Sequence, residues 1–93
     1  MRAGALWCTW IADPDAAPPR VAYAIGRAVG GAVVRNRLRR QLRARVAAAA
    51  RDDAIGPGWY LVGAAPAAAR ASRHDLDDAV AALLRSIGAQ VSR

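Results

Sequence analysis

The chain has 93 residues, a length that fits one small domain and excludes a protein with separate nucleotide-binding and substrate-binding halves. Its hydrophobic fraction of 55% overstates the core, because 25 of these residues are alanine and phenylalanine is absent. All 14 basic residues are arginine and all 7 acidic residues are aspartate, so the net charge is +7. A balance this positive indicates a polyanionic partner, and guanidinium groups can bind phosphate through two hydrogen bonds at once.

The cysteine and histidine counts and the hydropathy pattern exclude several further classes of protein. A single cysteine, Cys8, excludes an internal disulfide, and with only one histidine, His74, a structural zinc site is not supported. The longest uncharged stretch, residues 54–69, is too short to span a bilayer and contains glycine and proline. Residues 3–12 faintly resemble a signal peptide, but the Trp-Cys-Thr-Trp run within them favours a strand. We therefore expect a cytoplasmic protein without a membrane partner.

Two strands are predicted in the first quarter of the chain. Residues 5–11 (ALWCTWI) alternate in a way that favours a strand, and residues 12–19 (ADPDAAPP) form a loop. Residues 20–25 (RVAYAI) alternate large and small side chains, which predicts a second strand antiparallel to the first. Trp7 and Trp10 on the first strand, and Trp59 further along the chain, are assigned to the core by default. For Tyr23 on the second strand, a core position and a contact with RNA both stay open.

A long basic helix is predicted over residues 32–51. Apolar residues recur there at spacings of three or four, which predicts one buried stripe. This stripe consists of Val34, Leu38, Leu42, Val46 and Ala49. Six arginines fall within residues 35–45, and no acidic residue occurs between Asp15 and Asp52. Like charges at helical spacing repel one another, so an anion bound on the arginine face would stabilise the helix.

The last third of the chain predicts a strand and a second helix. Residues 59–63 (WYLVG) are apolar on both faces, which indicates a central strand that Pro66 ends. Ser72 and Asp75 have the spacing of a helix-capping pair, and an apolar stripe continues to Ile87. Gly88 is the predicted end of this helix, and residues 89–93 are expected to be a frayed tail.

No arrangement of side chains predicts catalysis or metal binding by the protein itself. His74 has no nucleophile motif around it, and Asp75, Asp77 and Asp78 are explained by the favourable interaction of acids with a helix amino terminus. The glycines at residues 26–31 lack the lysine and the spacing of a phosphate-binding loop. We expect no catalytic residue and no metal ligand.

The basic segment carries a resemblance to a known family. Residues 20–43 (RVAYAIGRAVGGAVVRNRLRRQLR) resemble the signature of the bacterial ribonuclease P protein subunit, in which Val-Gly, Ala-Val and Arg-Asn-Arg precede a basic helix. The later strand, the Pro-Ala-Ala segment and the closing helix also fit, so the resemblance covers about residues 5–88. The family's basic amino-terminal helix is expected to be missing from these 93 residues, since Met1 stands just before the first predicted strand; a misassigned start codon and a real loss are both open.

The resemblance implies an α+β fold in a single domain, residues 1–93, with a core at about 5–88. A small mixed sheet would carry the basic helix in a left-handed crossover, followed by a carboxy-terminal amphipathic helix. General connection rules alone would predict a right-handed crossover.

The resemblance also implies a function. The family's protein is a basic cofactor of a catalytic RNA, and together they remove the 5′ leader from precursor tRNA. The RNA holds Mg²⁺ and performs the hydrolysis, so the protein alone is expected to bind no cofactor. Its expected partners are the catalytic RNA and precursor tRNA, with no obligate protein partner.

The site residues follow from the same alignment of motifs. Tyr23 stands where an aromatic residue is usual and is a possible contact for the leader, on a cleft of the sheet. Gly31 and Ala28 replace residues that usually offer side-chain contacts to RNA. The residues expected to bind RNA are Arg27, Arg35, Asn36, Arg37, Arg39, Arg40 and Arg43.

Two other functions fit the basic helix less well. One is a non-enzymatic RNA-binding protein of ribosomal type with the same fold, against which the Arg-Asn-Arg spacing argues. The other is an amphipathic helix on an anionic membrane, which needs bulky apolar residues free to enter the lipid. Val34, Leu38 and Leu42 are required for the core instead.

Overall fold

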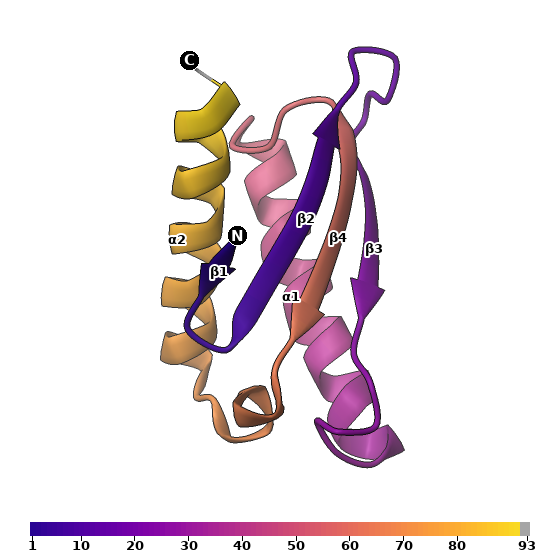
Figure 1. Cartoon of the computed structure of the whole chain (residues 1–93), viewed down its shortest axis with the longest axis vertical. Coiled ribbons are helices and arrows are strands. Elements are labelled where there is room, and N and C mark those ends of the chain that lie inside the picture. Colours follow the sequence, from indigo (N-terminus) through magenta and orange to yellow (C-terminus); the bar gives the residue numbers. More distant parts are fainter. Residues whose placement is uncertain (92–93) are drawn as a thin grey trace.

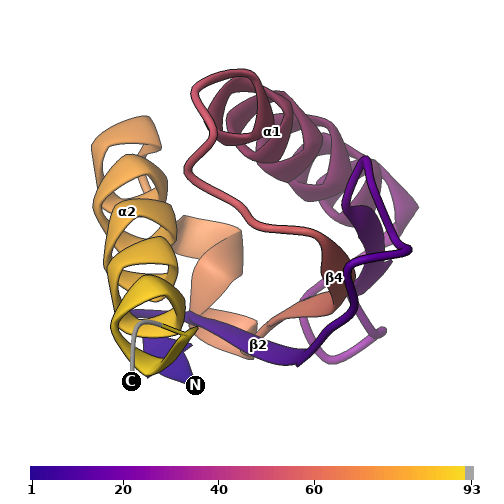
Figure 2. The ribbon, with the colours of Figure 1, turned by 90° about the horizontal axis from the view of Figure 1, so that it is seen from above.

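The computed structural model describes residues 1–91 as a four-stranded sheet with two long helices on one face (Figures 1 and 2). The elements follow in the order β1 (Arg2–Ala3), β2 (Leu6–Ala12), β3 (Arg20–Ala24), α1 (Ala32–Arg51), β4 (Gly58–Ala64), a 3₁₀ helix η1 (Pro66–Arg70) and α2 (Arg73–Val91). The α+β fold class is therefore confirmed. The short strand β1 and the helix η1 carry no periodic pattern that could predict them.

The strand β4 lies at the centre of the sheet, as its apolar sequence predicts, and the strand order is β1-β2-β4-β3. It pairs antiparallel with β2 and parallel with β3. The predicted orientation of β3 relative to β2 is correct, but the two strands are not neighbours because β4 lies between them. The partners on β3 and β4, such as Arg20 and Trp59, are 39 residues apart, and pairing at this distance is decided by packing and leaves no local signal.

The connection from β3 through α1 to β4 is a left-handed crossover. In Figure 1 both strands point down the page, β4 lies to the left of β3, and α1 passes behind the sheet. Figure 2 shows the same layers from above, with α1 on the side of the sheet away from the front of Figure 1. This hand agrees with the family resemblance and differs from the usual right-handed rule.

The core lies between the sheet and the two helices. Leu6 and Cys8 of β2 and Val62 of β4 face the helices, where burial raises the pKa of the Cys8 thiol. Leu38 and Leu42 of α1 are fully buried, which confirms the centre of the predicted apolar stripe. Since only one face of the sheet is covered, the other remains open to solvent.

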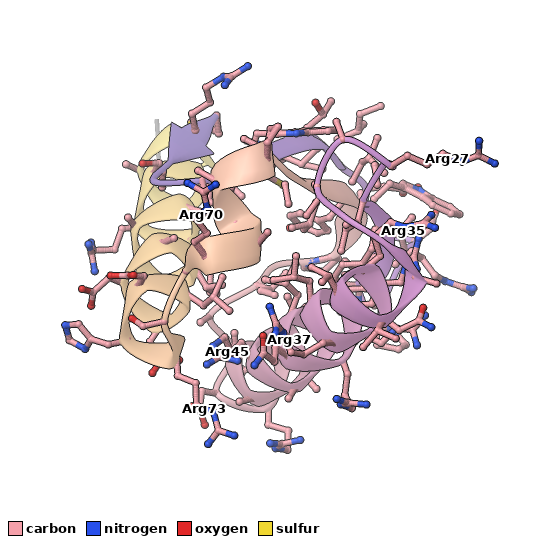
Figure 3. The ribbon with its side chains drawn as sticks, turned by 90° about the horizontal axis from the view of Figure 1, so that it is seen from below. Arg27, Arg35, Arg37, Arg45, Arg70 and Arg73 are labelled. Carbon is pink, nitrogen blue, oxygen red and sulfur yellow. The ribbon has the colours of Figure 1, made fainter. Side chains whose placement is uncertain are left out.

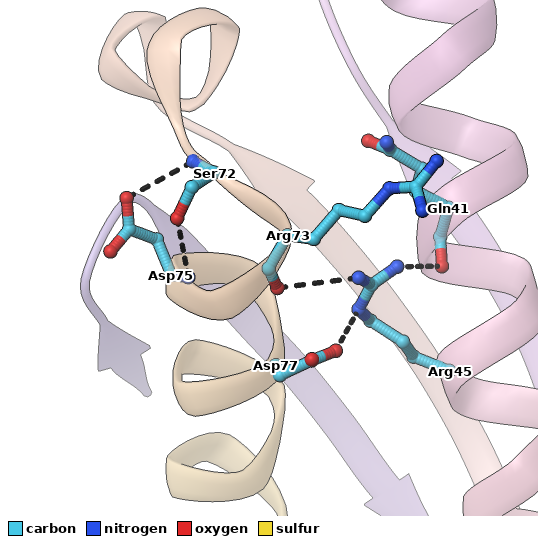
Figure 4. Close-up of polar contacts among 6 residues, drawn as sticks. All are labelled: Gln41, Arg45, Ser72, Arg73, Asp75 and Asp77. Atoms are coloured by element: carbon cyan, nitrogen blue, oxygen red, sulfur yellow. Dashed lines mark hydrogen bonds and ion pairs between the residues drawn. The ribbon is translucent and has the colours of Figure 1, made fainter.

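The second helix begins as predicted and ends later. The Ser72 hydroxyl accepts a hydrogen bond from the Asp75 N–H, and the Asp75 carboxylate accepts one from the Ser72 N–H, both at 3.0 Å (Figure 4). This reciprocal pair lowers the pKa of Asp75. The predicted end at Gly88 is wrong, because α2 continues to Val91. A single glycine costs a helix only about 1 kcal/mol; the rest of the predicted tail, residues 92–93, lies outside the described residues.

Candidate nucleic-acid interface

The helix α1 separates an apolar side from a guanidinium side. Leu38 and Leu42 are completely shielded, whereas Asn36, Arg40 and Arg43 are exposed. Arg35, Arg37 and Arg39 are half-buried along the borders of the apolar stripe. The helix therefore packs on the sheet through its apolar side and presents a row of arginine side chains on the other side.

The predicted RNA-binding arginines are not neutralised by the protein's own acids. Two ion pairs occur within residues 1–91, Arg45 with Asp77 and His74 with Asp78, and neither includes one of these arginines. Arg39 Nη1 donates to Asn36 Oδ1 at 3.2 Å, and Arg40 is exposed. The positive charge on this side is therefore available to an outside anion.

Figure 3 shows Arg27 and Arg35 on one side of the amino-terminal half of α1 and Arg37 on the other, next to Arg45. Arg27 lies in the turn before the helix, and its carbonyl accepts a hydrogen bond from the Gly30 N–H at 3.2 Å. Arg35 Nε is buried without a hydrogen-bond partner, an arrangement that favours an added acceptor at this guanidinium. Arg37 Nη2 donates to the Ala69 carbonyl of η1 at 3.2 Å, which fixes the direction of that side chain.

Arg45 is the exception among the helix arginines. Its Nε lies 2.6 Å from Asp77 Oδ1, and its other nitrogens donate to the carbonyls of Gln41 at 3.0 Å and Arg73 at 3.3 Å (Figure 4). Only 17% of its side chain is exposed. The sequence places Arg45 at the edge of the apolar stripe, and the structure shows it joining α1 to α2.

Tyr23 lies on the helix-covered face of the sheet. Its register partner is Val62, and the guanidinium of Arg43 lies 5.7 Å from the centre of the tyrosine ring. Burial raises the pKa of Tyr23, and the charge of Arg43 opposes that rise. The Tyr23 ring therefore packs against Arg43 of α1 and does not border the open face of the sheet.

The open face of the sheet presents apolar side chains that the sequence assigned to the core. Trp59 is 51% exposed, and its register partner Ile11 is 68% exposed. Leu61, nearer to the middle of β4, is also exposed. The Trp59 indole N–H donates to Asp13 Oδ2 at 2.9 Å and lowers the pKa of Asp13, while Arg20 lies 5.9 Å from the Trp59 ring centre. A shallow groove of about 380 Å³ runs over these residues. The sequence pattern alone could not predict this groove. A strand with apolar side chains on both faces has the same pattern whether one face or both faces are covered in the folded protein.

Metal and membrane sites do not appear among the described residues. Within residues 1–91 there is no group of three or more histidine, cysteine, aspartate or glutamate side chains placed to hold a metal ion. Over the same residues, neither helix combines the length and the hydropathy needed to cross a bilayer.

The fold and the basic face together define a small α+β protein whose crossover helix carries exposed arginines along one side. Residues 3–88 match the family model described as ribonuclease P. The chain therefore belongs to the ribonuclease P protein family.

Individual relatives agree with this assignment. The ribonuclease P protein component of Beutenbergia cavernae is 43% identical over 72 residues, which cover 76% of this chain and 59% of the relative. That of Acidothermus cellulolyticus is 48% identical over 66 residues, covering 69% of this chain and 52% of the relative. The chain thus spans a little over half the length of these relatives.

A solved structure shares the fold. The RNase P protein of Staphylococcus aureus superposes with a TM-score of 0.82 over 94% of this chain and 78% of that chain. Sequence identity is 15%, so this likeness speaks for the architecture alone.

Proposed function

We propose that the chain is the protein component of ribonuclease P, which assists endonucleolytic removal of the 5′ leader from precursor tRNA. The observation that carries this proposal is the helix α1, whose exposed arginines face solvent without an acidic partner while Leu38 and Leu42 anchor it. Family membership supplies the identity of the polyanion, the catalytic RNA subunit. The protein would work in the cytoplasm without an obligate protein partner.

The binding step rests on guanidinium chemistry. Each arginine offers a planar fork of N–H donors that matches two phosphate oxygens. Arg35, Arg37 and Arg39 are half-buried beside the apolar stripe of α1. Their side chains therefore lose little conformational entropy when phosphate binds. Arg27, Asn36, Arg40 and Arg43 complete the proposed RNA-binding set. Neutralising these charges also removes repulsion within the helix.

The open sheet face is the proposed site for the single-stranded leader. An exposed indole such as Trp59 gives a base a surface for stacking, worth about 1–3 kcal/mol per base. Arg20 beside that ring can pair with a leader phosphate. Tyr23 lies on the opposite, helix-covered face of the sheet, so Trp59 is the stronger candidate for a leader contact on the open face.

In this proposal the RNA performs the hydrolysis and holds the Mg²⁺ ions. The protein's residues bind and orient: α1 would bind the RNA subunit, and the sheet face would position the leader. Neutralising phosphate charge with arginine also reduces the amount of magnesium that the RNA needs to fold and bind substrate.

The proposal is tested by measuring precursor-tRNA cleavage with the ribonuclease P RNA encoded in the same genome, at low Mg²⁺. We expect the chain to raise kcat/KM, and the variant Trp59→Ala to lose part of that gain for substrates with a long leader. With a one-nucleotide leader, Trp59→Ala should match the unmodified chain. Tight RNA binding without any stimulation of cleavage would contradict the proposal and favour a non-enzymatic RNA-binding protein of ribosomal type.

A further inference from the structure

We infer that a groove between β3 and α1 binds one unpaired base of the RNA subunit, with Tyr23 and Arg43 as its main contacts. This edge groove has a volume of about 360 Å³, and its lining includes Val21, Tyr23, Arg43, Val46, Ala47 and Ile55. It lies along the strand β3, which forms the right-hand edge of the sheet in Figure 1. The inference rests on the proposed function, because it names a further contact with the same RNA.

The two tyrosines of the chain differ in how their hydroxyl groups are used. The Tyr60 hydroxyl donates to the carbonyl of Gly56 at 2.8 Å. The Tyr23 hydroxyl has no hydrogen-bond partner among residues 1–91, although its side chain is half-buried. Burial raises the pKa of Tyr23, so the hydroxyl stays protonated near neutral pH and can both donate and accept. A buried tyrosine usually finds such a partner, and the edge of a nucleobase offers donors and acceptors.

Arg43 gives the edge groove a flat surface as well as a charge. Its guanidinium lies 5.7 Å from the centre of the Tyr23 ring. The Arg43 side chain is exposed and makes no ion pair within residues 1–91, so the side of the guanidinium away from the ring is open. Unpaired RNA bases stack on guanidinium planes as well as on aromatic rings. A base in this position would extend the Tyr23–Arg43 stack and cover the apolar side chains of Val46 and Ala47.

The charges around the edge groove suit a base inside it and a phosphate outside it. Among the described residues that line the groove, Arg43 alone is charged. Asp52 and Asp53 come shortly before Ile55 of the lining, and their charges oppose a phosphate at that end. Arg39 stands one helical turn before Arg43, on the same flank of α1. A nucleotide with its phosphate at Arg39 and its base in the groove would satisfy both ends.

The position of the edge groove favours the RNA subunit over the leader of precursor tRNA. Val21 and Tyr23 face the helices, whereas the leader is proposed to lie on the opposite, open face beside Trp59. The edge groove also continues directly into the row of arginine side chains, because Arg43 belongs to both. One RNA surface can therefore occupy the row and the groove together.

The test measures binding of the RNA subunit alone, as a function of salt, by two variants that keep the charge of the chain. Tyr23→Leu removes the ring and the hydroxyl but leaves an apolar side chain for the core. Ala47→Leu fills the groove from an exposed position. Each variant should weaken binding about tenfold through lost stacking. The slope of log K against log salt should not change, whereas Arg39→Ala should reduce it by about 0.7–0.9 for one lost phosphate contact.

The matched control is Ala81→Leu, at an exposed alanine of α2 that does not line the groove. Leucine and alanine are both good helix formers, so Ala47→Leu and Ala81→Leu should fold alike. Ala47→Leu therefore decides the result if urea denaturation shows that Tyr23→Leu is unfolded. Chemical probing of base edges in the RNA should show one base that the unmodified chain and the control protect and the groove variants do not.

The possible results separate this inference from the proposed function. Unchanged binding by the folded groove variants would overturn the inference and leave the proposed function standing. An equal loss in Ala81→Leu, or a reduced salt slope in the groove variants, would also overturn it, because the loss would not come from a stacked base. Base protection that requires precursor tRNA would overturn it too, since the base would then belong to the substrate. If the unmodified chain fails to bind the RNA subunit, the proposed function itself is wrong.

Discussion

Trp7 and Gly63 show how a single pair of residues shapes the open face. They are register partners on β2 and β4, and the indole of Trp7 lies directly over the glycine. A Cβ atom at Gly63 would stand 2.0 Å from two ring carbons, far inside any allowed contact. The absence of a side chain at Gly63 therefore lets the large ring lie flat against the sheet.

Replacing this glycine tests the arrangement. Gly63→Ala must push the Trp7 ring off the sheet, and we expect the free energy of unfolding to fall by about 1–3 kcal/mol, as measured by urea denaturation. Gly56→Ala is the control, because a Cβ there meets no atom within 4 Å. Equal stability of the two variants would show that the ring moves at no cost.

Residue roles divide into those that local pattern can predict and those that it cannot. The Ser72–Asp75 pair was predictable, because capping depends on residues three positions apart. The exposure of Trp59 and the covered position of Tyr23 were not, because they depend on which face of the sheet the helices occupy. The sequence assigned Trp59 to the core by default and left Tyr23 open between the core and a contact with RNA.

At the scale of elements, α1 is the part of the fold that the sequence predicts best. Its bounds, Ala32–Arg51, match the predicted range because helical periodicity is a local property. The neighbours of β3 depend on long-range packing, and the hand of the crossover came from the family resemblance rather than from any rule of connection. The bounds of α1 and the start of α2 were thus predictable from local pattern, whereas the end of α2 and the order of the strands were not.

The two sides of α1 should respond to substitution in opposite ways. Leu42→Ala opens a cavity beneath the helix and should lower the free energy of unfolding by about 2–5 kcal/mol in urea denaturation. Arg40→Ala removes an exposed cation and should leave stability within about 0.5 kcal/mol while weakening RNA binding several-fold. A loss of helical circular dichroism in Arg40→Ala would show instead that this arginine is structural.

The whole molecule combines a thin core with an uneven charge distribution. Its net charge of +7 arises almost entirely from α1 and its flanks, so the free protein carries unrelieved repulsion on one side. The core consists mainly of aliphatic side chains and alanine, together with Cys8 and Tyr60. Stability of the free chain is therefore expected to depend strongly on bound anions.

This dependence can be measured by thermal unfolding with inorganic tripolyphosphate. A polyanion that binds only the folded state should raise Tm progressively with concentration. The variant Arg39→Ala/Arg40→Ala/Arg43→Ala should show a much smaller rise in Tm at the same ionic strength. An equal rise in both proteins would place the anion elsewhere on the surface.

The central position of β4 also determines when the sheet can form during synthesis. Both β2 and β3 pair with a strand that begins at Gly58, so of the described strand pairs only the short β1–β2 pair can form before the ribosome has made nearly two thirds of the chain. The nascent α1 precedes β4 and can form at once, because its hydrogen bonds are local. A cationic helix therefore emerges from the ribosome before the sheet that covers its apolar side is complete, and that side stays exposed to aggregation until β4 has been made.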